Sequence, residues 1–567
     1  MKQSFIAVAL AISPALCIGQ TLLPIPDTLS GTAFDLTMHK DSVQFLPGAK
    51  TNTMAFNAYS YLGPTLIMQK GANISITVNN EIGDTTTVHW HGLHIPPQDD
   101  GGPHTPIMPG ETWNPEFEVM NSAATYWYHP HFHGKTALHA MRGAAGMIII
   151  RDGEEAALSL PRTYGVDDIP LIVQSQQLDP DNQIDERGMV DSIIIVNGKI
   201  NTYKPLPAQV VRLRLLNAAG ERNFNFGFSG NKSFSVIGND NGLLPAPVST
   251  TRLMLSPGER AEVLLDLSGM NGQTLYLMSY ATEIPMGVQG GPTMPMPEGS
   301  EPMNSSLNGV DFNILQINVT PAISGGVTAI PATLVPQTPW AESSAMITRT
   351  INFTADSEMV MDGPFYFNDS TFDMMRIDYK IPLNNIEIWE FTNHTMVAHP
   401  FHIHDVHFFV LDRDGNPPPM LERGRKDVVL VKPDETVRVI MKFEHFADST
   451  TPYMYHCHVL MHEDDGMMGQ FLVMPATGTG ISTTSYAGGK VSVYPNPGQG
   501  LYRVRLDEAV ASATAVVYNE TGMAVWTGAF KNTDQFEVDI HGRSAGSYLL
   551  RVVTEKGQLT QKITLLQ

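Results

Sequence analysis

The chain has 567 residues, and its 35 basic and 57 acidic side chains give a formal net charge of -22. That length exceeds what one hydrophobic core organises and predicts several domains. The negative balance disfavours nucleic acid and anionic membrane surfaces as partners, and it mildly favours cationic metal or organic substrates. With 48 Gly, 40 Pro and 16% charged residues, the composition is typical of a turn-rich β protein.

The first residues are typical of an exported protein. Lys2 precedes an apolar run from Phe5 to Ile18, which is too short to span a bilayer and ends near small residues. We therefore predict a secretory signal peptide over residues 1–19, with lipoprotein acylation of Cys17 as a weaker alternative. Cleavage would leave Cys457 as the only cysteine, so that thiol is either free or a ligand, and no internal disulfide is possible.

Three segments along the chain share one outline. Each alternates apolar and polar residues with the period of a strand, runs into an asparagine, and is followed by an acidic turn that opens another strand. The strands are Ile74–Val78, Val211–Leu215 and Ile386–Phe391, the asparagines are Asn79, Asn217 and Asn393, and the turns are residues 109–112, 257–260 and 433–436. The repetition predicts three copies of one β-sandwich domain, over residues 22–153, 154–320 and 330–475.

Histidines gather in four His-X-His motifs. Two lie in the first domain and two in the third: His89-Trp90-His91, His129-Pro130-His131, His402-Ile403-His404 and His456-Cys457-His458. Because successive side chains of a strand alternate, each motif places two imidazoles on one face. Eight imidazoles are too many for one ion, so we expect a cluster between these two domains. The middle domain contains no histidine and supplies none.

Cys457 marks a second candidate site, on the opposite face of the same strand. His462 and Met467 follow it closely enough to fold back onto the thiolate, and His399 remains as a further imidazole. A thiolate, two imidazoles and a weak thioether are the ligands of a blue-copper site. The alternative is a zinc site, or a buried cysteine among surface histidines.

A small polar segment after Pro475 is typical of a linker, and residues 488–567 follow as a separate unit. This unit resembles the C-terminal sorting domain of the type IX secretion system in Val493–Pro497, Ser544–Tyr548 and Gln561–Ile563. The resemblance implies export by the secretion machinery to the cell surface or the medium, with the periplasm as the other destination. A small adhesive β domain is the alternative.

The four histidine motifs resemble the copper signatures of the three-domain multicopper oxidases, a family that includes laccases, bilirubin oxidase, the spore-coat laccase and the bacterial copper-efflux oxidase. The similarity is greatest to the copper-efflux type, through His129–Lys135 and His456–Asp464. It implies an all-β fold of three cupredoxin-like Greek-key β-sandwich domains, followed here by a small C-terminal β-sandwich sorting domain.

The resemblance also implies which residues hold four copper ions. Type 1 copper would bind His399, Cys457, His462 and Met467, and type 2 copper would bind His89 and His402. The type 3 pair would bind His91, His129 and His458 on one ion and His131, His404 and His456 on the other. The implied activity oxidises a substrate one electron at a time and reduces dioxygen to water, with Asp100 and Glu463 relaying protons.

The sequence leaves the reductant open. We expect phenols and other small organic reductants first, with Cu(I), other metal ions or bilirubin as alternatives. Thioethers prefer Cu(I), and a Pro/Gly-rich loop carries Met286, Met294, Met296 and Met303. Methionine also fills gaps in cores and loops, and the copper-efflux pattern of Asp and Met before the first type 1 histidine is altered here, where Thr395 to Ala398 precede His399.

Two rivals come from other functional classes. A copper-free cell-division protein of the same fold would lack the complete ligand set. A simple blue-copper electron carrier would have no use for eight further histidines. Copper analysis separates the three hypotheses, because they require about four ions, none or one per chain.

Overall fold

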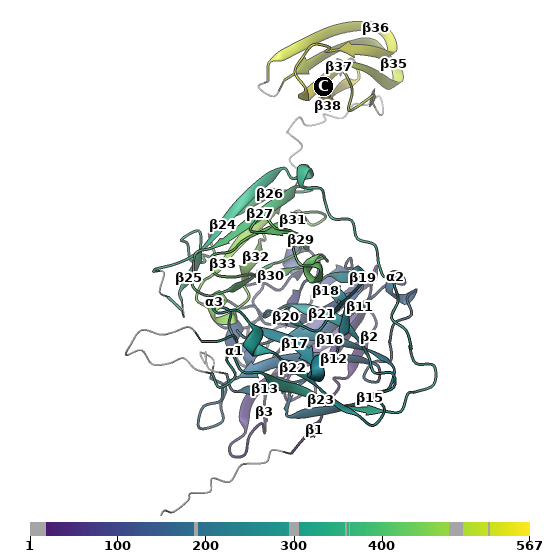
Figure 1. The fold of residues 1–567 in the computed structure, drawn as a ribbon. Helices are drawn as coiled ribbons and strands as arrows, with labels where there is room; N and C mark the ends of the chain where they lie inside the picture. The colour runs from purple at the N-terminus through teal and green to yellow at the C-terminus, as the bar shows by residue number, and fades with distance from the viewer. Residues whose placement is uncertain are drawn as a thin grey trace, which may run out of the picture. The chain divides into compact units, whose positions relative to one another are not determined.

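The computed structural model describes residues 19–185, 191–293, 305–357, 360–361, 363–475, 491–519 and 522–566. One compact unit ends at Pro475 and a second begins at Ala476. Both units consist mainly of strands, so the expectation of an all-β protein is confirmed (Figure 1). The predicted signal peptide, apart from Gly19, and the predicted linker lie outside the described residues.

Two sheets make up residues 28–151. The first has the order β2-β5-β11-β10-β7 and contains Thr28–Ser30, Thr65–Gln69, Gly146–Arg151, Ala124–His129 and His89–His91. The second has the order β4-β3-β6-β8 with β9 beside β6, and contains Thr51–Phe56, Ala33–Val43, Asn73–Asn80, Thr112–Trp113 and Glu116–Glu118. Apolar side chains of both sheets, such as Leu36 of β3 and Tyr126 of β10, form one buried core.

The next two sheets lie mainly in residues 168–320. One has the order β14-β13-β12-β16-β21-β18-β19, in Lys199–Ile200, Ile193–Val196, Asp168–Gln176, Val210–Asn217, Arg260–Asp266, Phe234–Asn239 and Gly242–Thr250. The other has the order β1-β15-β23-β22-β17-β20, in Thr21–Leu22, Thr202–Pro207, Phe312–Thr320, Thr274–Ser279, Phe224–Phe228 and Leu253–Leu255. The N-terminal strand β1 thus pairs with a strand of the middle segment.

Residues 347–474 form a third pair of sheets. One has the order β25-β24-β27-β31-β29, in Phe365–Phe367, Ile347–Ala355, Ile386–Asn393, Thr436–Lys442 and Phe408–Arg413. The other has the order β26-β33-β32-β28-β30, in Tyr379–Pro382, Met468–Met474, Tyr453–Cys457, His399–Ile403 and Val428–Val431. Cys457 lies in the core between these sheets, which explains why its side chain points away from the neighbouring histidines.

Helices are short throughout the described residues. The α-helices are α1 (Thr136–Met141), α2 (Gly153–Ala156) and α3 (Leu460–Asp464), and the 3-10 turns are η1 (Pro97–Asp99), η2 (Ser229–Asn231), η3 (Ala281–Glu283), η4 (Glu342–Ser344) and η5 (Met420–Glu422). No helix in the described ranges is long and apolar enough to cross a membrane.

The predicted threefold repeat is visible in one recurring turn. In each copy an asparagine N–H donates to the carbonyl of a glutamate in the acidic turn, at 3.0, 3.1 and 3.1 Å in the pairs Asn80–Glu111, Asn217–Glu259 and Asn393–Glu435. Each asparagine side chain also accepts the N–H two residues on. The prediction of Asn79 as the first member was wrong by one residue, because β6 extends to Asn80.

The second unit is a sheet with the order β34-β35-β37-β38 and β36 beside β35. Its strands are Val491–Tyr494, Leu501–Tyr518, Gly546–Thr554, Gly557–Leu565 and Ala524–Asp539. It has a hydrophobic core of its own, which includes Val504, Val538 and Leu550. Such a core is what an independently folding domain requires.

Candidate metal centres

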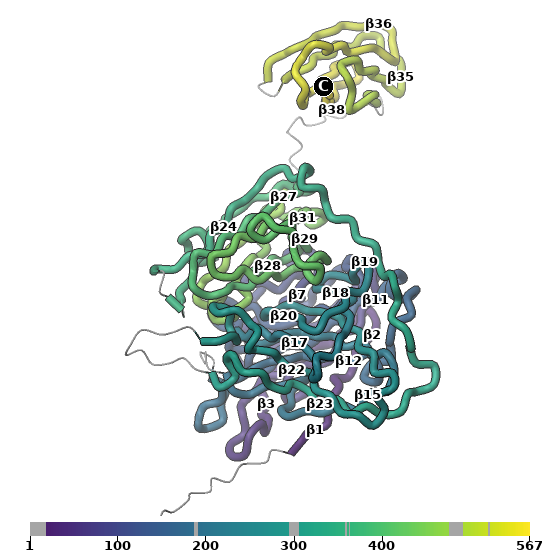
Figure 2. The backbone as a smooth tube through the Cα atoms, viewed as in Figure 1, coloured from purple at the N-terminus to yellow at the C-terminus, as the bar shows by residue number. Residues whose placement is uncertain are grey.

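The four His-X-His motifs come together at the ends of two pairs of strands. His89 on β7 lies opposite His129 on β10, and His402 on β28 lies opposite His456 on β32. The remaining members are His91 on β7, and His131, His404 and His458, which follow the strand ends. All eight side chains are buried. Strands from the beginning and from the end of the first unit therefore meet at the histidine cluster (Figure 2).

The imidazoles of His91, His129 and His458 converge on one point and form the first trio of the cluster. Nδ1 of His91 lies 3.2 Å from Nε2 of His458 and 3.5 Å from Nε2 of His129. The outer nitrogens have other partners, since Nε2 of His91 lies 3.1 Å from Oδ1 of Asp427 and Nδ1 of His129 lies 2.8 Å from the carbonyl of Pro130. A neutral imidazole has one N–H and one lone pair. With the N–H groups turned outward at these two rings, lone pairs face inward.

A second trio repeats this arrangement. Nε2 of His131 lies 3.1 Å from Nε2 of both His404 and His456. The outer nitrogens meet carboxylates: Nδ1 of His404 lies 2.7 Å from Oδ2 of Asp100, while Nδ1 of His131 and of His456 lie 3.3 and 3.2 Å from Glu463. Three lone pairs that face one point repel one another unless a cation binds between them. Outer partners of this kind orient metal-binding histidines.

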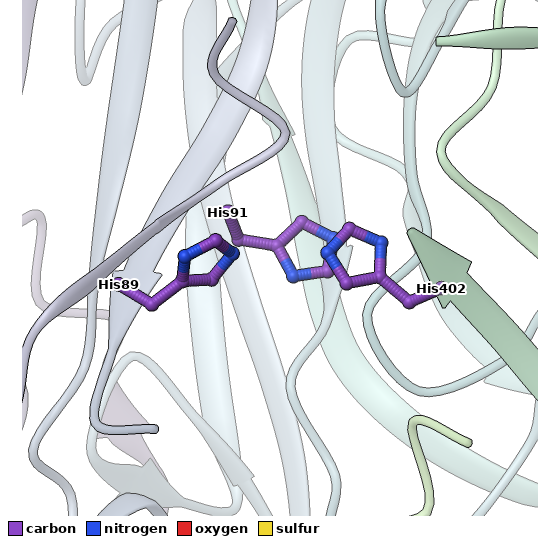
Figure 3. Close-up of side chains that lie close together, drawn as sticks. All are labelled: His89, His91 and His402. Carbon is purple, nitrogen blue, oxygen red and sulfur yellow. The ribbon is translucent and has the colours of Figure 1, made fainter. Parts of the chain in front are cut away.

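His89 and His402 complete the cluster with one inward nitrogen each. Their Nε2 atoms are buried and have no hydrogen-bond partner among the described residues. Their Nδ1 atoms lie 2.9 and 2.8 Å from the backbone carbonyls of Asp100 and Asp427. Figure 3 shows the two rings with that of His91 between them, and donor atoms of all three lie within 4.8 Å of one another. A buried lone pair without a donor is what a metal ligand requires.

Burial keeps six of the eight cluster rings in the form that binds metal. Desolvation lowers the pKa of His131 to about 3. It also lowers the pKa well below the ordinary value at His91, His129, His402, His404 and His458. Since metals bind the neutral imidazole, no proton has to be displaced from these nitrogens at neutral pH.

The candidate site at Cys457 is a separate group on the other face of β32. Its Sγ lies 3.5 Å from Nδ1 of both His399 and His462. Nε2 of His399 lies 2.9 Å from the Thr395 hydroxyl, which fixes the ring with Nδ1 toward the sulfur. The buried Met467 joins the same turn through backbone bonds, accepting from Cys457 at 3.0 Å and donating to His462 at 2.8 Å.

The environment of Cys457 is buried and apolar. The ring of Phe365 packs against those of His399 and His462, with centroid distances of 4.7 and 4.6 Å. Burial raises the pKa of the Cys457 thiol and lowers that of His462 to about 3. A thiolate at this position therefore needs a bound cation. One thiolate with two imidazoles fits copper, whereas structural zinc sites use four strong ligands.

The structure brings together the histidine and cysteine members of each set assigned from the sequence, and it places the backbone of Met467 beside Cys457 and His462. Asp100 and Glu463, the expected proton relays, are buried beside the second trio. Sequence reasoning missed Asp427 and Arg260, which form a buried ion pair behind His91. One signal was available: the repeated acidic turn ends in threonine in the outer copies, at Thr112 and Thr436, but in arginine in the middle copy.

The methionines proposed as a Cu(I) site are described only in part. Met286 is exposed on the surface. Met294, Met296 and Met303 lie outside the described residues. The Cu(I) hypothesis remains a prediction from the sequence.

Models of known protein families match the segments of the chain that form the sheets described above. Models described as multicopper oxidase match residues 37–155, 171–292 and 338–477. A model of the secretion system C-terminal sorting domain matches residues 492–565.

Individual relatives cover the same part of the chain. A multicopper oxidase of Staphylococcus haemolyticus is 32% identical over 78% of this chain and 88% of its own length. The cell division protein FtsP of Xenorhabdus nematophila is 31% identical over 80% of this chain and 93% of its own. The structure of a laccase-like multicopper oxidase, CueO, from Ochrobactrum sp. is similar with a TM-score of 0.71 and 33% identity, over 80% of this chain and all of that one. The chain thus belongs to the multicopper oxidase family, with cupredoxin-like domains and a C-terminal secretion sorting domain.

Proposed function

We propose that the protein holds four copper ions and couples one-electron oxidation of reducing substrates to the four-electron reduction of dioxygen to water. The observation that supports this best is the convergence of buried nitrogen and sulfur donors in separate groups, two of which share strand β32. Copper in these sites supplies electron uptake from the substrate and electron delivery to oxygen.

The proposed ligand sets follow the geometry described above. A type 1 ion is held by His399, Cys457, His462 and Met467. A type 2 ion is held by His89 and His402, and the type 3 pair by His91, His129 and His458 and by His131, His404 and His456. Measuring copper per purified chain tests this assignment: about four ions support it, one ion indicates an electron carrier, and none indicates a copper-free relative of the FtsP kind.

The backbone of β32 gives the two centres a direct connection. Cys457 lies between His456 and His458, so one peptide unit on either side joins the proposed type 1 ligand to a ligand of each trio. A covalent path this short suits electron transfer from the substrate side to the oxygen side. It also fixes the separation of the two centres, because strand geometry is stiff.

Reduction of one dioxygen to two waters consumes four protons, and two buried carboxylates are placed to hand them over. Asp100 contacts His404, and Glu463 lies between His131 and His456. Oδ1 of Asp100 lies 3.4 Å from Nδ1 of His89, and the oxygens of Glu463 lie 3.3 and 3.2 Å from Nδ1 of His131 and of His456. Carboxylates this close to the cluster imidazoles are placed to pass protons toward the cluster.

We propose laccase-like oxidation of phenols and other small organic molecules as the activity, with Cu(I) or another metal ion as the second candidate. The Ochrobactrum relative is described as active towards lignin model compounds and lignosulfonate. A structural relative from Campylobacter jejuni, at 26% identity, is described as a metallo-oxidase. Oxygen uptake measured side by side with a substituted phenol, Cu(I) and bilirubin decides between the substrates.

We further propose that the signal peptide and the sorting domain direct the protein outward through the type IX secretion system. The support is the family match over residues 492–565 and the apolar start of the chain. The final location is the cell surface or the medium.

A further inference from the structure

A buried arginine of the middle segment reaches the histidine cluster through one carboxylate. Nη1 and Nη2 of Arg260 lie 2.6 and 2.7 Å from Oδ1 and Oδ2 of Asp427. The same Oδ1 lies 3.1 Å from Nε2 of His91. All three side chains are buried, so water does not compete for these hydrogen bonds. The planar guanidinium fixes the plane of the carboxylate.

Asp427 orients two rings of the cluster at once. Its carboxylate accepts from Nε2 of His91, and its backbone carbonyl accepts from Nδ1 of His402 at 2.8 Å. The contact of Nε2 with Asp427 reflects an orientation that differs from that of the other trio members. His91 faces its trio with Nδ1, whereas the others face theirs with Nε2. Its N–H must therefore sit on Nε2, and Asp427 provides the acceptor that holds it there.

The guanidinium of Arg260 is itself held in place, because each of its N–H groups donates a hydrogen bond. Nε donates to the carbonyl of Thr125 at 3.0 Å, and Nη2 donates to that of Asp240 at 2.9 Å. Nη1 donates to the carbonyl of Gly258 at 3.1 Å. With the two bonds to Asp427, all five N–H groups are used. Lysine has three donors on a compact ammonium and cannot reproduce this fork.

Two glycines make room for this arrangement. A Cβ on Gly92 would lie 2.7 Å from Nη2 of Arg260 and would overlap the Asp427 carboxylate. A Cβ on Gly258 would lie 2.8 Å from the ring of His458. Both glycines have a φ of +84°, which also disfavours a side chain. The turn that ends at Arg260 thus contacts the first trio directly as well as through Asp427.

We propose that Arg260 is a positioning residue for the cluster: through Asp427 it fixes the ring orientation and protonated nitrogen of His91. The middle domain, which supplies no ligand, would in this way set the geometry of the metal site. This inference rests on the copper assignment proposed above.

The test is the variant Arg260→Lys, which keeps the charge and removes the fork. We expect it to retain the blue absorption of the Cys457 site and to bind the cluster copper about 10- to 100-fold more weakly in a chelator titration. We also expect more copper to become visible by EPR, since an intact coupled pair is silent. The matched control is Arg212→Lys, an equally buried arginine of the same sheet that pairs with Glu262 and Glu155.

The control separates positioning from stability. Both variants should lower the melting temperature, but Arg212→Lys should leave cluster affinity and the EPR spectrum as in the wild type. Unchanged cluster affinity in Arg260→Lys, or the same spectral change in both variants, overturns the inference. A wild type that binds no cluster copper instead refutes the proposed function.

A milder variant serves if Arg260→Lys does not fold. Nδ2 of Asn241 donates to Oδ2 of Asp427, so Asn241→Ala removes one constraint on the carboxylate without removing a charge. We expect a smaller loss of cluster affinity, of the order of a few-fold, with the blue absorption retained. Wild-type affinity in this variant counts against the inference.

Discussion

Nδ1 of His404 lies 2.7 Å from Oδ2 of Asp100, and both side chains are buried at the proposed oxygen site. Asp100→Asn keeps the shape but removes the basic oxygen. If Asp100 relays protons, oxygen uptake should fall about 10²-fold or more, while the blue absorption of the separate Cys457 site stays. Asp99→Asn, at the half-buried neighbour, is the control and should keep its activity. Normal turnover in Asp100→Asn would remove this residue from the mechanism.

Glu463 is predicted to act in the same way from the other side of the cluster. It lies between His131 and His456, with Oε1 and Oε2 at 3.3 and 3.2 Å from their Nδ1 atoms. Glu463→Gln should slow oxygen reduction while the blue absorption of the Cys457 site is retained, because the amide still fills the space but does not take up a proton. Stopped-flow reoxidation of the reduced enzyme measures this step directly. A rate equal to that of the wild type contradicts the prediction.

Cys457 carries the third prediction. Strong orange-red absorption requires charge transfer from a thiolate to Cu(II), and this is the only described cysteine. Cys457→Ser should therefore be colourless and should not oxidise organic substrates, while the eight cluster imidazoles still bind copper. Met461→Leu, a change at a half-buried neighbour outside the ligand set, should remain blue. A blue serine variant, or a colourless copper-loaded wild type, would refute the assignment.

The fourth prediction concerns stability and pH at Asp168. Its buried carboxylate accepts from Nε and Nη2 of Arg214 at 2.7 and 3.0 Å and from Arg151 at 2.8 Å. Burial raises the pKa of Asp168, but Arg214 and Arg212 outweigh it and hold the pKa below the ordinary value. The stabilisation is thus present above the unfolded pKa of about 3.9 and is lost as pH falls through the folded value.

Asp168→Asn should accordingly cost about 3–5 kcal/mol at neutral pH, because it removes one of the two buried carboxylates that pair with the buried guanidinium of Arg214. The difference from the wild type should shrink in acid. Calorimetric melting over a pH series measures it, and Asp181→Asn, at an exposed position, is the control. An equal loss at all pH values would mean that the carboxylate charge is not responsible.

Local sequence pattern was sufficient for the strands and for the ligand motifs. Alternation and spacing depend on neighbouring residues, so β6, β16 and β27 and the four His-X-His motifs were found where the structure has them. The boundary at Asn79 was missed by one residue, because the end of a strand is set by its partner and not by its own pattern. In the structure that partner is the acidic turn around Glu111.

Contacts distant in sequence could not be predicted in this way. His91 and Asp427 are 336 residues apart, and no periodicity links them. Nor does a motif say which nitrogen of His91 faces the cluster, since this depends on the acceptor behind the ring. A buried Arg260 has no sequence pattern of its own, apart from the departure from threonine at the end of the repeated turn.

The sorting domain gives a prediction about export. All proposed ligands precede Pro475, where the first compact unit ends. Deleting residues 488–567 should therefore leave copper content and oxidase activity unchanged, while the protein stays in the periplasm of a host with the secretion system. Cell fractionation with an intact-chain control measures this. A truncated protein at the surface or in the medium would refute the sorting role.

Each trio of the cluster takes rings from both ends of the first unit: His91 and His129 are completed by His458, and His131 by His404 and His456. Neither end alone supplies all three rings of either trio. A chain that is still emerging from a translocation channel, with its later strands inside, therefore has no complete pocket to fill. Loading of these ions must follow folding, so metal acquisition reports that both ends of the first unit have come together.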